Sequence, residues 1–122
     1  MARILVVDED GTTRRVIRAL VEDAGHDVVE ANNGKEGLRA MGVDVPALVI
    51  TELYMDDMDG IEFLRTIRDR WPDEPVLVMS SRRGPTVDRI VKIAGLLGAS
   101  GLLSKPIAEE SLLEQVGAIL TA

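Results

Sequence analysis

The chain has no cysteine, only three aromatic side chains and no long apolar run. Without cysteine it can form no disulfide and carry no thiolate chemistry, which suits a reducing compartment, so we expect a cytoplasmic protein. Phe63, Trp71 and Tyr54 are too few rings for a base-stacking surface. No stretch approaches the roughly 18 apolar residues of a membrane span, and no signal peptide is recognisable. The sequence therefore predicts a soluble protein that does not act on a membrane.

Basic residues are also in the minority, with 14 Lys and Arg against 21 Asp and Glu and a net charge of −7. This balance lacks the electrostatic footprint of a nucleic-acid-binding protein. The 122 residues contain no linker, repeat or low-complexity segment. We expect residues 1–122 to form a single domain, either as a stand-alone protein or as the front piece of a longer one.

Five short apolar runs alternate with five amphipathic segments along the chain. The runs are rich in branched side chains and lack polar alternation, which is typical of parallel strands buried on both faces. Apolar residues at helical spacing follow each run. Regular strand–helix alternation with short loops favours an α/β fold with one doubly wound, five-stranded parallel sheet. The expected strands are residues 4–7, 28–29, 47–51, 76–79 and 101–103.

Four of these strands end at polar residues of different kinds. Because the carboxyl ends of parallel strands share one edge of the sheet, where ligands bind, we expect these residues to meet. Carboxylates, a hydroxyl and an ammonium gathered at one edge predict a site for a divalent cation and a phosphoryl group. The residues are Asp8, Glu9 and Asp10 after the first strand, Glu52 after the third, Ser80 after the fourth and Lys105 after the fifth.

Several of these residues also have ordinary structural interpretations. Asp10 could cap the first helix, and Ser80 could cap the fourth. Asp8 and Glu9 are harder to explain in this way, because neighbouring buried carboxylates raise each other's pKa unless a cation such as Mg²⁺ stabilises them. Lys105 at the end of a buried strand needs an anionic partner, and Pro106 would fix the turn after it, with a cis bond as one option.

The pattern as a whole resembles the receiver domain of two-component response regulators. An acidic pair, a central acid, a Ser or Thr and a Lys-Pro follow strands one, three, four and five of that family, and the segment from Pro46 to Gly60 is similar to its phosphoacceptor region. The resemblance implies a flavodoxin-like sheet with strand order 2-1-3-4-5. It assigns four positions to a Mg²⁺ site: Asp8, Glu9, Glu52 and the main-chain carbonyl of Tyr54.

The same resemblance assigns Glu52 to the phosphoacceptor position, with Ser80 bonding the phosphoryl group and Lys105 pairing with it. It implies a signalling domain in a phosphorelay rather than an enzyme. The implied partners are a sensor histidine kinase, a phosphotransfer protein or a downstream effector. Arg14 matches a commonly basic position without a catalytic role.

The chain departs from the family at two positions. Glu52 replaces the phosphoacceptor aspartate, and one extra methylene moves the carboxylate by more than about 1 Å, a displacement that can cost roughly 10² in rate. Self-phosphorylation is therefore not expected to be efficient. Leu102 replaces a Tyr or Phe that turns inward on activation in many relatives. Two hypotheses follow: Glu52 imitates the phosphorylated state, or it forms a structural ion pair with Lys105.

Two alternatives remain open on the sequence alone. The segment from Asp8 to Thr12 also fits the Asp-x-Asp-Gly-Thr signature of haloacid-dehalogenase-like phosphatases, with Asp8 as nucleophile and Asp10 as acid/base, although the later acidic motif of that family is lacking. The chain could otherwise be a pseudo-receiver that only binds proteins. Leu96 or Leu97 either fills the space beside Gly95 or belongs to an apolar patch on helix four, strand five and helix five, a surface suited to a homodimer. Arg82 and Arg83 are expected in a solvated loop.

Overall fold

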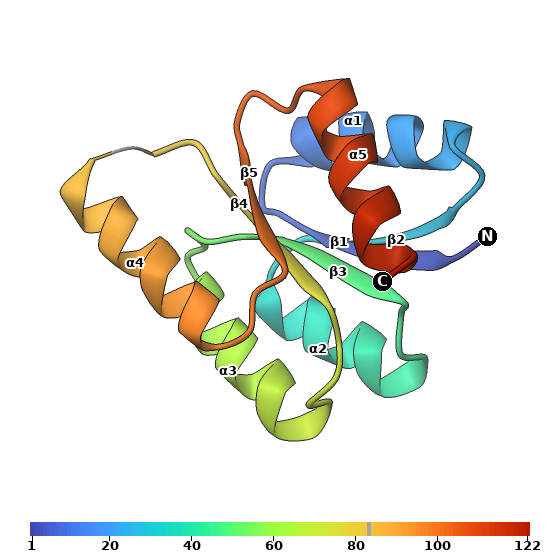
Figure 1. The fold of residues 1–122 in the computed structure, drawn as a ribbon. Helices are drawn as coiled ribbons and strands as arrows, with labels where there is room; N and C mark the ends of the chain where they lie inside the picture. The colour runs from blue at the N-terminus through green and yellow to red at the C-terminus, as the bar shows by residue number, and fades with distance from the viewer. Residues whose placement is uncertain (83) are drawn as a thin grey trace.

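Five parallel strands form one sheet in the order β2-β1-β3-β4-β5 in a computed structural model of the chain (Figure 1). The structure describes residues 1–82 and 84–122, so Arg83 lies outside the described residues. Strands and helices alternate throughout, which confirms the predicted doubly wound α/β fold and its strand order. The strands are β1 (Arg3–Val7), β2 (Asp27–Ala31), β3 (Leu48–Glu52), β4 (Val76–Ser80) and β5 (Gly101–Ser104).

The register of the sheet brings the carboxyl ends of its strands to one edge. Val7 lies beside Thr51, Glu52 beside Met79, and Ser80 beside Ser104. The central strands β3 and β4 are buried along their whole length, as their apolar sequences predict. β2 is longer than the two residues predicted, because this edge strand carries polar positions that hide it from a search for apolar runs.

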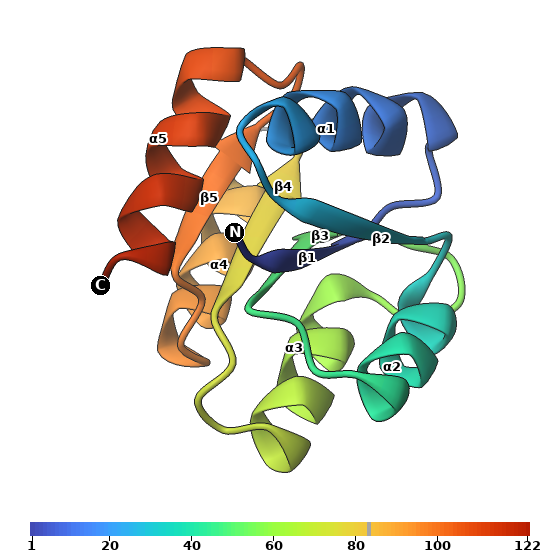
Figure 2. The same ribbon diagram turned by 90° about the vertical axis from the view of Figure 1, so that its right-hand side faces the viewer.

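The helices cover both faces of the sheet, with α1 and α5 on one face and α2, α3 and α4 on the other (Figures 1 and 2). Each face has its own apolar core, one around Ile17 and Leu112 and the other around Phe63 and Ile67. Among the described residues, no helix combines the length and hydropathy that a bilayer span requires. The helices are α1 (Gly11–Asp23), α2 (Gly34–Val43), α3 (Gly60–Arg70), α4 (Pro85–Leu96) and α5 (Glu109–Leu120).

Helix caps determine where the chain leaves the sheet edge. The Asp10 carboxylate caps α1 by accepting the Thr12 N–H, and Asp59 caps α3 by accepting the Glu62 N–H. Gly25 follows α1 with a φ of 97°, in the left-handed region that glycine enters at little cost. The caps formed by Asp10 and Asp59 thus fix the loops that lead from the carboxyl edge into α1 and α3.

Candidate functional site

Lys105 joins two acids that are far apart in sequence. Its Nζ donates to Oδ2 of Asp8 at 2.6 Å and to Oε1 of Glu52 at 2.7 Å. Asp8 directly follows β1, Glu52 ends β3, and Lys105 directly follows β5, so the sheet topology alone brings the three side chains together. The Lys105–Pro106 peptide bond is cis. The predicted convergence at the carboxyl edge is therefore present in the structure.

The two acids are almost completely shielded from water. Asp8 is 2% exposed and Glu52 5% exposed. Burial lowers the pKa of Lys105, but its hydrogen bonds to Asp8 and Glu52 outweigh this effect and raise the pKa overall. The ammonium thus stays charged and is shared between two carboxylates, an arrangement in which each charge depends on the others.

Backbone N–H groups satisfy the remaining carboxylate oxygens. Oε2 of Glu52 accepts from the N–H of Leu53 at 2.7 Å and from that of Tyr54 at 3.4 Å. Oδ1 of Asp8 accepts from the N–H of Asp10 at 2.9 Å. Glu52 is therefore held between Lys105 on one side and its own loop on the other.

The loop after Glu52 packs directly against the first residue of α3. A Cβ atom on Gly60 would lie 2.6 Å from Cα of Leu53 and 2.8 Å from the carbonyl oxygen of Glu52. Both neighbours are backbone atoms that cannot rotate away. Glycine at position 60 thus permits the close approach that places the Leu53 N–H against the Glu52 carboxylate.

Ser80 lies at the same edge, but its hydroxyl bonds within its own loop. Oγ accepts from the N–H of Arg82 at 3.1 Å and lies 3.4 Å from the Arg82 carbonyl oxygen. The Arg82 guanidinium lies over the Tyr54 ring, 4.0 Å from its centroid, which is a cation–π contact. Among the described residues the Ser80 hydroxyl makes no hydrogen bond to Glu52 or to the Lys105 ammonium, although the Ser80 carbonyl accepts from the Lys105 N–H at 2.9 Å.

The acidic residues fit a Mg²⁺ site with two protein carboxylates. The carboxylate of Glu9, which is exposed, accepts from the Asp56 N–H and lies in the loop next to Asp8. No cluster of three or more His, Cys, Asp or Glu side chains suited to a metal occurs among the described residues. Mg²⁺ accepts one or two carboxylates and keeps several waters, so Asp8 and Glu9 satisfy its chemistry. Lys105 engages the carboxylates of both Asp8 and Glu52, so each of them would have to share or give up that contact to bind the ion.

Asp10 serves as a helix cap. Its carboxylate accepts from the Thr13 hydroxyl at 2.9 Å and from the Thr12 N–H at 3.0 Å, and these bonds lower the pKa of Asp10. A general acid needs a pKa close to the working pH. Asp10 is therefore poorly suited to the acid/base role that the phosphatase alternative requires.

An ion-pair network supports Asp8 from behind and was not predicted from the sequence. Arg14 donates to the main-chain carbonyl of Asp8 and pairs with Glu30 at 3.1 Å, while Arg18 pairs with Glu30 at 2.9 Å. The hydrogen bond from Arg18 and the nearby Arg14 together lower the pKa of Glu30 against the effect of burial. Sequence reasoning missed Glu30 on β2, because its partners Arg14 and Arg18 lie on α1 and no sequence spacing marks the pairing.

Comparison with known proteins assigns most of the chain to one family. Residues 4–117 match the response regulator receiver domain family. The chain is 36% identical over 119 residues to the response regulator MprA of Mycolicibacterium vanbaalenii and 35% identical to that of Mycobacterium leprae. Each match covers 97% of this chain and 50% of the relative, so the chain spans about half the length of these relatives.

Solved structures show the same fold. The chemotaxis response regulator CheY4 of Vibrio cholerae superposes with a TM-score of 0.88 and 27% identity, over 98% of both chains. NtrX from Brucella abortus superposes with a TM-score of 0.90 and 26% identity, over 98% of this chain and 27% of that one. With a family match over nearly its whole length and the same five-stranded fold, the chain belongs to the response regulator receiver domains of two-component signalling.

Proposed function

We propose that this receiver domain works without phosphorylation, with Glu52 making permanently the contact to Lys105 that a phosphoryl group would otherwise make. The observation that supports this proposal is the 2.7 Å hydrogen bond between Lys105 Nζ and Glu52 Oε1. The second carboxylate oxygen accepts from the Leu53 N–H and is not presented to a phosphodonor. Phosphoryl transfer depends on positioning an in-line nucleophile, and both oxygens of this carboxylate are already engaged by hydrogen bonds.

Receiver domains generally bind Mg²⁺ at this edge of the sheet. In this chain Asp8 and Glu9 would hold the ion with the main-chain carbonyl of Tyr54. Asp8 would have to share its contact with Lys105 to do so, and Glu52 would join them only by leaving Lys105. The bound ion would supply positive charge next to two acids. Asp8 would remain oriented by the Asp10 N–H, and Lys105 would continue to neutralise Glu52. Signalling through the site would then depend on the ion pair rather than on a transferred group.

The hydrogen bonding of Ser80 distinguishes two forms of this proposal, full imitation of the phosphorylated state and a fixed surface without such imitation. A full imitation of the phosphorylated state would draw the Ser80 hydroxyl toward Glu52, whereas here that hydroxyl bonds the backbone of Arg82. Leu102, 37% exposed on β5, also has no ring to turn inward. The form that we favour is therefore a receiver with a fixed partner-binding surface, which no phosphorylation step switches.

We place the partner surface on α4, β5 and α5. Leu96 is 80% exposed on α4, and Ile93 and Leu102 are partly exposed nearby, while Leu97 turns toward the core. The partner would be a second copy of this chain, a sensor histidine kinase, a phosphotransfer protein or an effector. Mass measurement in solution on Leu96→Glu tests the homodimer, with Val43→Glu, an exposed apolar residue on α2, as the matched control. Dimer loss in the first variant alone supports this surface, and a monomeric parent rejects the homodimer.

The remaining parts of the proposal concern the setting of the domain. Residues 1–122 act as one signalling unit of a cytoplasmic protein, for which the cysteine-free composition is suited. The unit binds partners and catalyses no reaction on a small-molecule substrate. Its acidic net charge of −7 favours protein partners over nucleic acid.

The test compares amide NMR spectra of the parent and Glu52→Asp, each with and without acetyl phosphate and Mg²⁺. We expect the phosphodonor to change the spectrum of the aspartate variant from β4 to α5 and to leave that of the parent unchanged. A parent spectrum that coincides with the phosphorylated variant at Ser80 and Leu102 would favour full imitation. A parent that responds as the variant does would contradict the proposal.

A further inference from the structure

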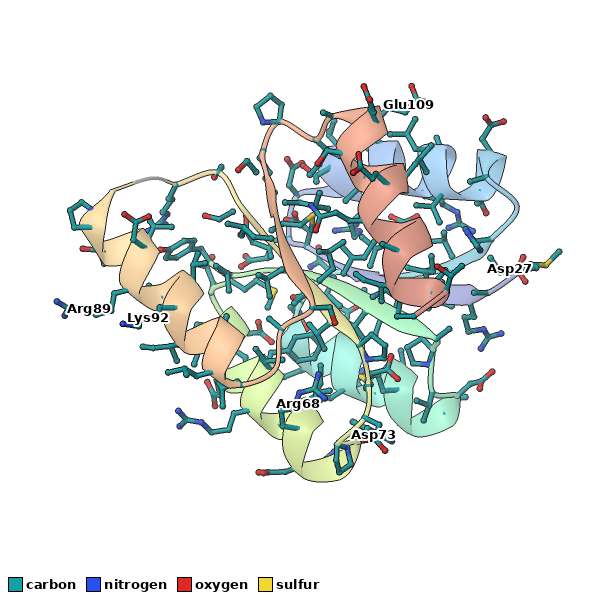
Figure 3. All side chains as sticks on the ribbon, in the orientation of Figure 1. Asp27, Arg68, Asp73, Arg89, Lys92 and Glu109 are labelled. Carbon is teal, nitrogen blue, oxygen red and sulfur yellow. The ribbon has the colours of Figure 1, made fainter. Side chains whose placement is uncertain are left out.

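A recess lies at the edge of the sheet opposite the one that carries Lys105. It has a volume of about 670 Å³, within the range of small-molecule sites. Its walls come from the end of α3, the segments that lead into β4 and β5, and the end of α5, with Figure 3 labelling Arg68 and Asp73 on this side. Pro72, Pro75 and Ile119 give it apolar walls.

The Glu74 side chain lines this recess without a partner. The residue is 7% exposed, Oε2 is fully buried, and neither carboxylate oxygen accepts a hydrogen bond within the described part of the chain. Burying a carboxylate without a partner is costly, and the site therefore has an unmet need for a donor. Asp73 lies beside it at the rim and adds a second negative charge.

The nearest cation does not meet that need. Arg68 uses one terminal nitrogen on the Pro72 carbonyl at 2.6 Å and the other on the main-chain carbonyl of Glu74. Among the described residues Arg68 forms no ion pair with the Glu74 carboxylate, and the buried Nε of Arg68 and Oε2 of Glu74 both lack a hydrogen-bond partner. The guanidinium therefore shapes the loop and leaves the acid unpaired.

We propose that this recess binds an organic cation, a primary ammonium or guanidinium group on a short apolar stem, through the Glu74 carboxylate. The charged head would donate to Glu74 and be attracted by Asp73, and the stem would lie along Pro75 and Ile119. The exposed Ser100 at the rim offers a further hydroxyl acceptor. The site is separate from the Lys105 cluster and does not depend on the signalling proposal.

The protonation state of Glu74 should make the affinity of this site depend on pH. Burial raises the pKa of Glu74 to about 7, against the opposing effect of Arg68. The other charged groups on the residues that line the recess are the side chains of Asp73 and Arg68 and the terminal carboxylate of Ala122. A bound cation favours the ionised carboxylate, so the affinity should rise as the pH increases through 7.

The experiment titrates n-butylguanidinium into the ¹⁵N-labelled protein at constant ionic strength and follows the amides of Glu74, Gly98 and Ser100. We expect saturable shifts confined to the recess, an affinity that is higher at pH 8 than at pH 6, and a loss of about tenfold or more in Glu74→Gln. Glutamine has the same shape and no charge, so this variant retains the fold. Glu114→Gln removes one exposed charge from α5 and serves as the matched control.

An arginine-containing tripeptide, blocked at both ends, distinguishes the source of the cation. Tighter binding of the tripeptide than of n-butylguanidinium assigns the site to a basic side chain of a protein, and the reverse assigns it to a small amine. Equal affinities in the parent and Glu74→Gln would overturn the proposal. So would shifts spread over all surface carboxylates, which indicate counterion binding, or the absence of shifts in the recess.

Discussion

Replacing Lys105 by Met should destabilise the domain strongly while nearly preserving the packing of the side-chain stem at position 105. Methionine keeps most of the apolar stem of lysine and removes the ammonium that Asp8 and Glu52 share at 2.6 and 2.7 Å. Both carboxylates are then left buried next to one another without a cation. Their backbone donors from Asp10 and Leu53 remain, so only the ionic contribution is lost.

The magnitude follows from the burial of the cluster. The Lys105 side chain is 14% exposed, and its two partners are less exposed still, so solvent screens the cluster weakly. Breaking a buried ion pair on one side costs about 3–5 kcal/mol. For a domain of this size that cost lowers Tm by roughly 10–20 °C.

Urea denaturation at pH 8 measures this effect, with Lys92→Met on the exposed face of α4 as the control (Figure 3). The control should change stability by less than about 0.5 kcal/mol. The double variant Glu52→Gln with Lys105→Met should recover part of the loss, because a neutral amide needs no cation. A loss below about 1 kcal/mol at pH 8, or no recovery in the double variant, would refute the buried ion-pair argument.

Three further predictions concern other parts of the fold. The pKa of Glu74 is raised from 4.5 to about 7, so the folded state holds this proton more tightly than the unfolded state, and the free energy of unfolding should fall by up to about 3 kcal/mol as the pH rises through this window. Glu74→Gln should abolish that fall in urea titrations, and an unchanged dependence of stability on pH would assign the fall to another group. Gly60→Ala should cost about 1–3 kcal/mol by forcing Cβ into backbone atoms, whereas Gly95→Ala on α4, with open space around it, should be neutral or stabilising by up to about 1 kcal/mol in the same assay. Arg14→Met should cost about 1–2 kcal/mol by removing the donor to the Asp8 carbonyl, and thermal unfolding that matches the parent would show that Arg18 alone suffices for Glu30.

The sheet and the Lys105 cluster could be predicted because simple rules govern them. Continuous apolar runs indicate strands buried on both faces, and parallel strands share one carboxyl edge. Asp8, Glu52 and Lys105 therefore had to lie near one another once the strands were recognised. β2 was predicted too short, because its polar positions on the outer strand interrupt the apolar run.

The recess lined by Glu74 could not be predicted, because its chemistry depends on packing between distant segments. Pro72 to Pro75 has the composition of a solvated turn, with two prolines and two acids. Glu74 is 7% exposed and lines a recess that the end of α5 and the segment around Gly98 also border, contacts that the local sequence does not reveal. Sequence spacing also does not reveal which donor a long side chain chooses, as with Arg68 and the carbonyl of Pro72.

Incubation with acetyl phosphate and Mg²⁺, read by intact mass, tests the central claim most directly. The parent should gain no phosphoryl group, because Lys105 and the Leu53 N–H engage both oxygens of the Glu52 carboxylate. Glu52→Asp should gain one phosphoryl group, which would show that the rest of the cradle is intact. Stoichiometric labelling of the parent at Glu52 would contradict the account.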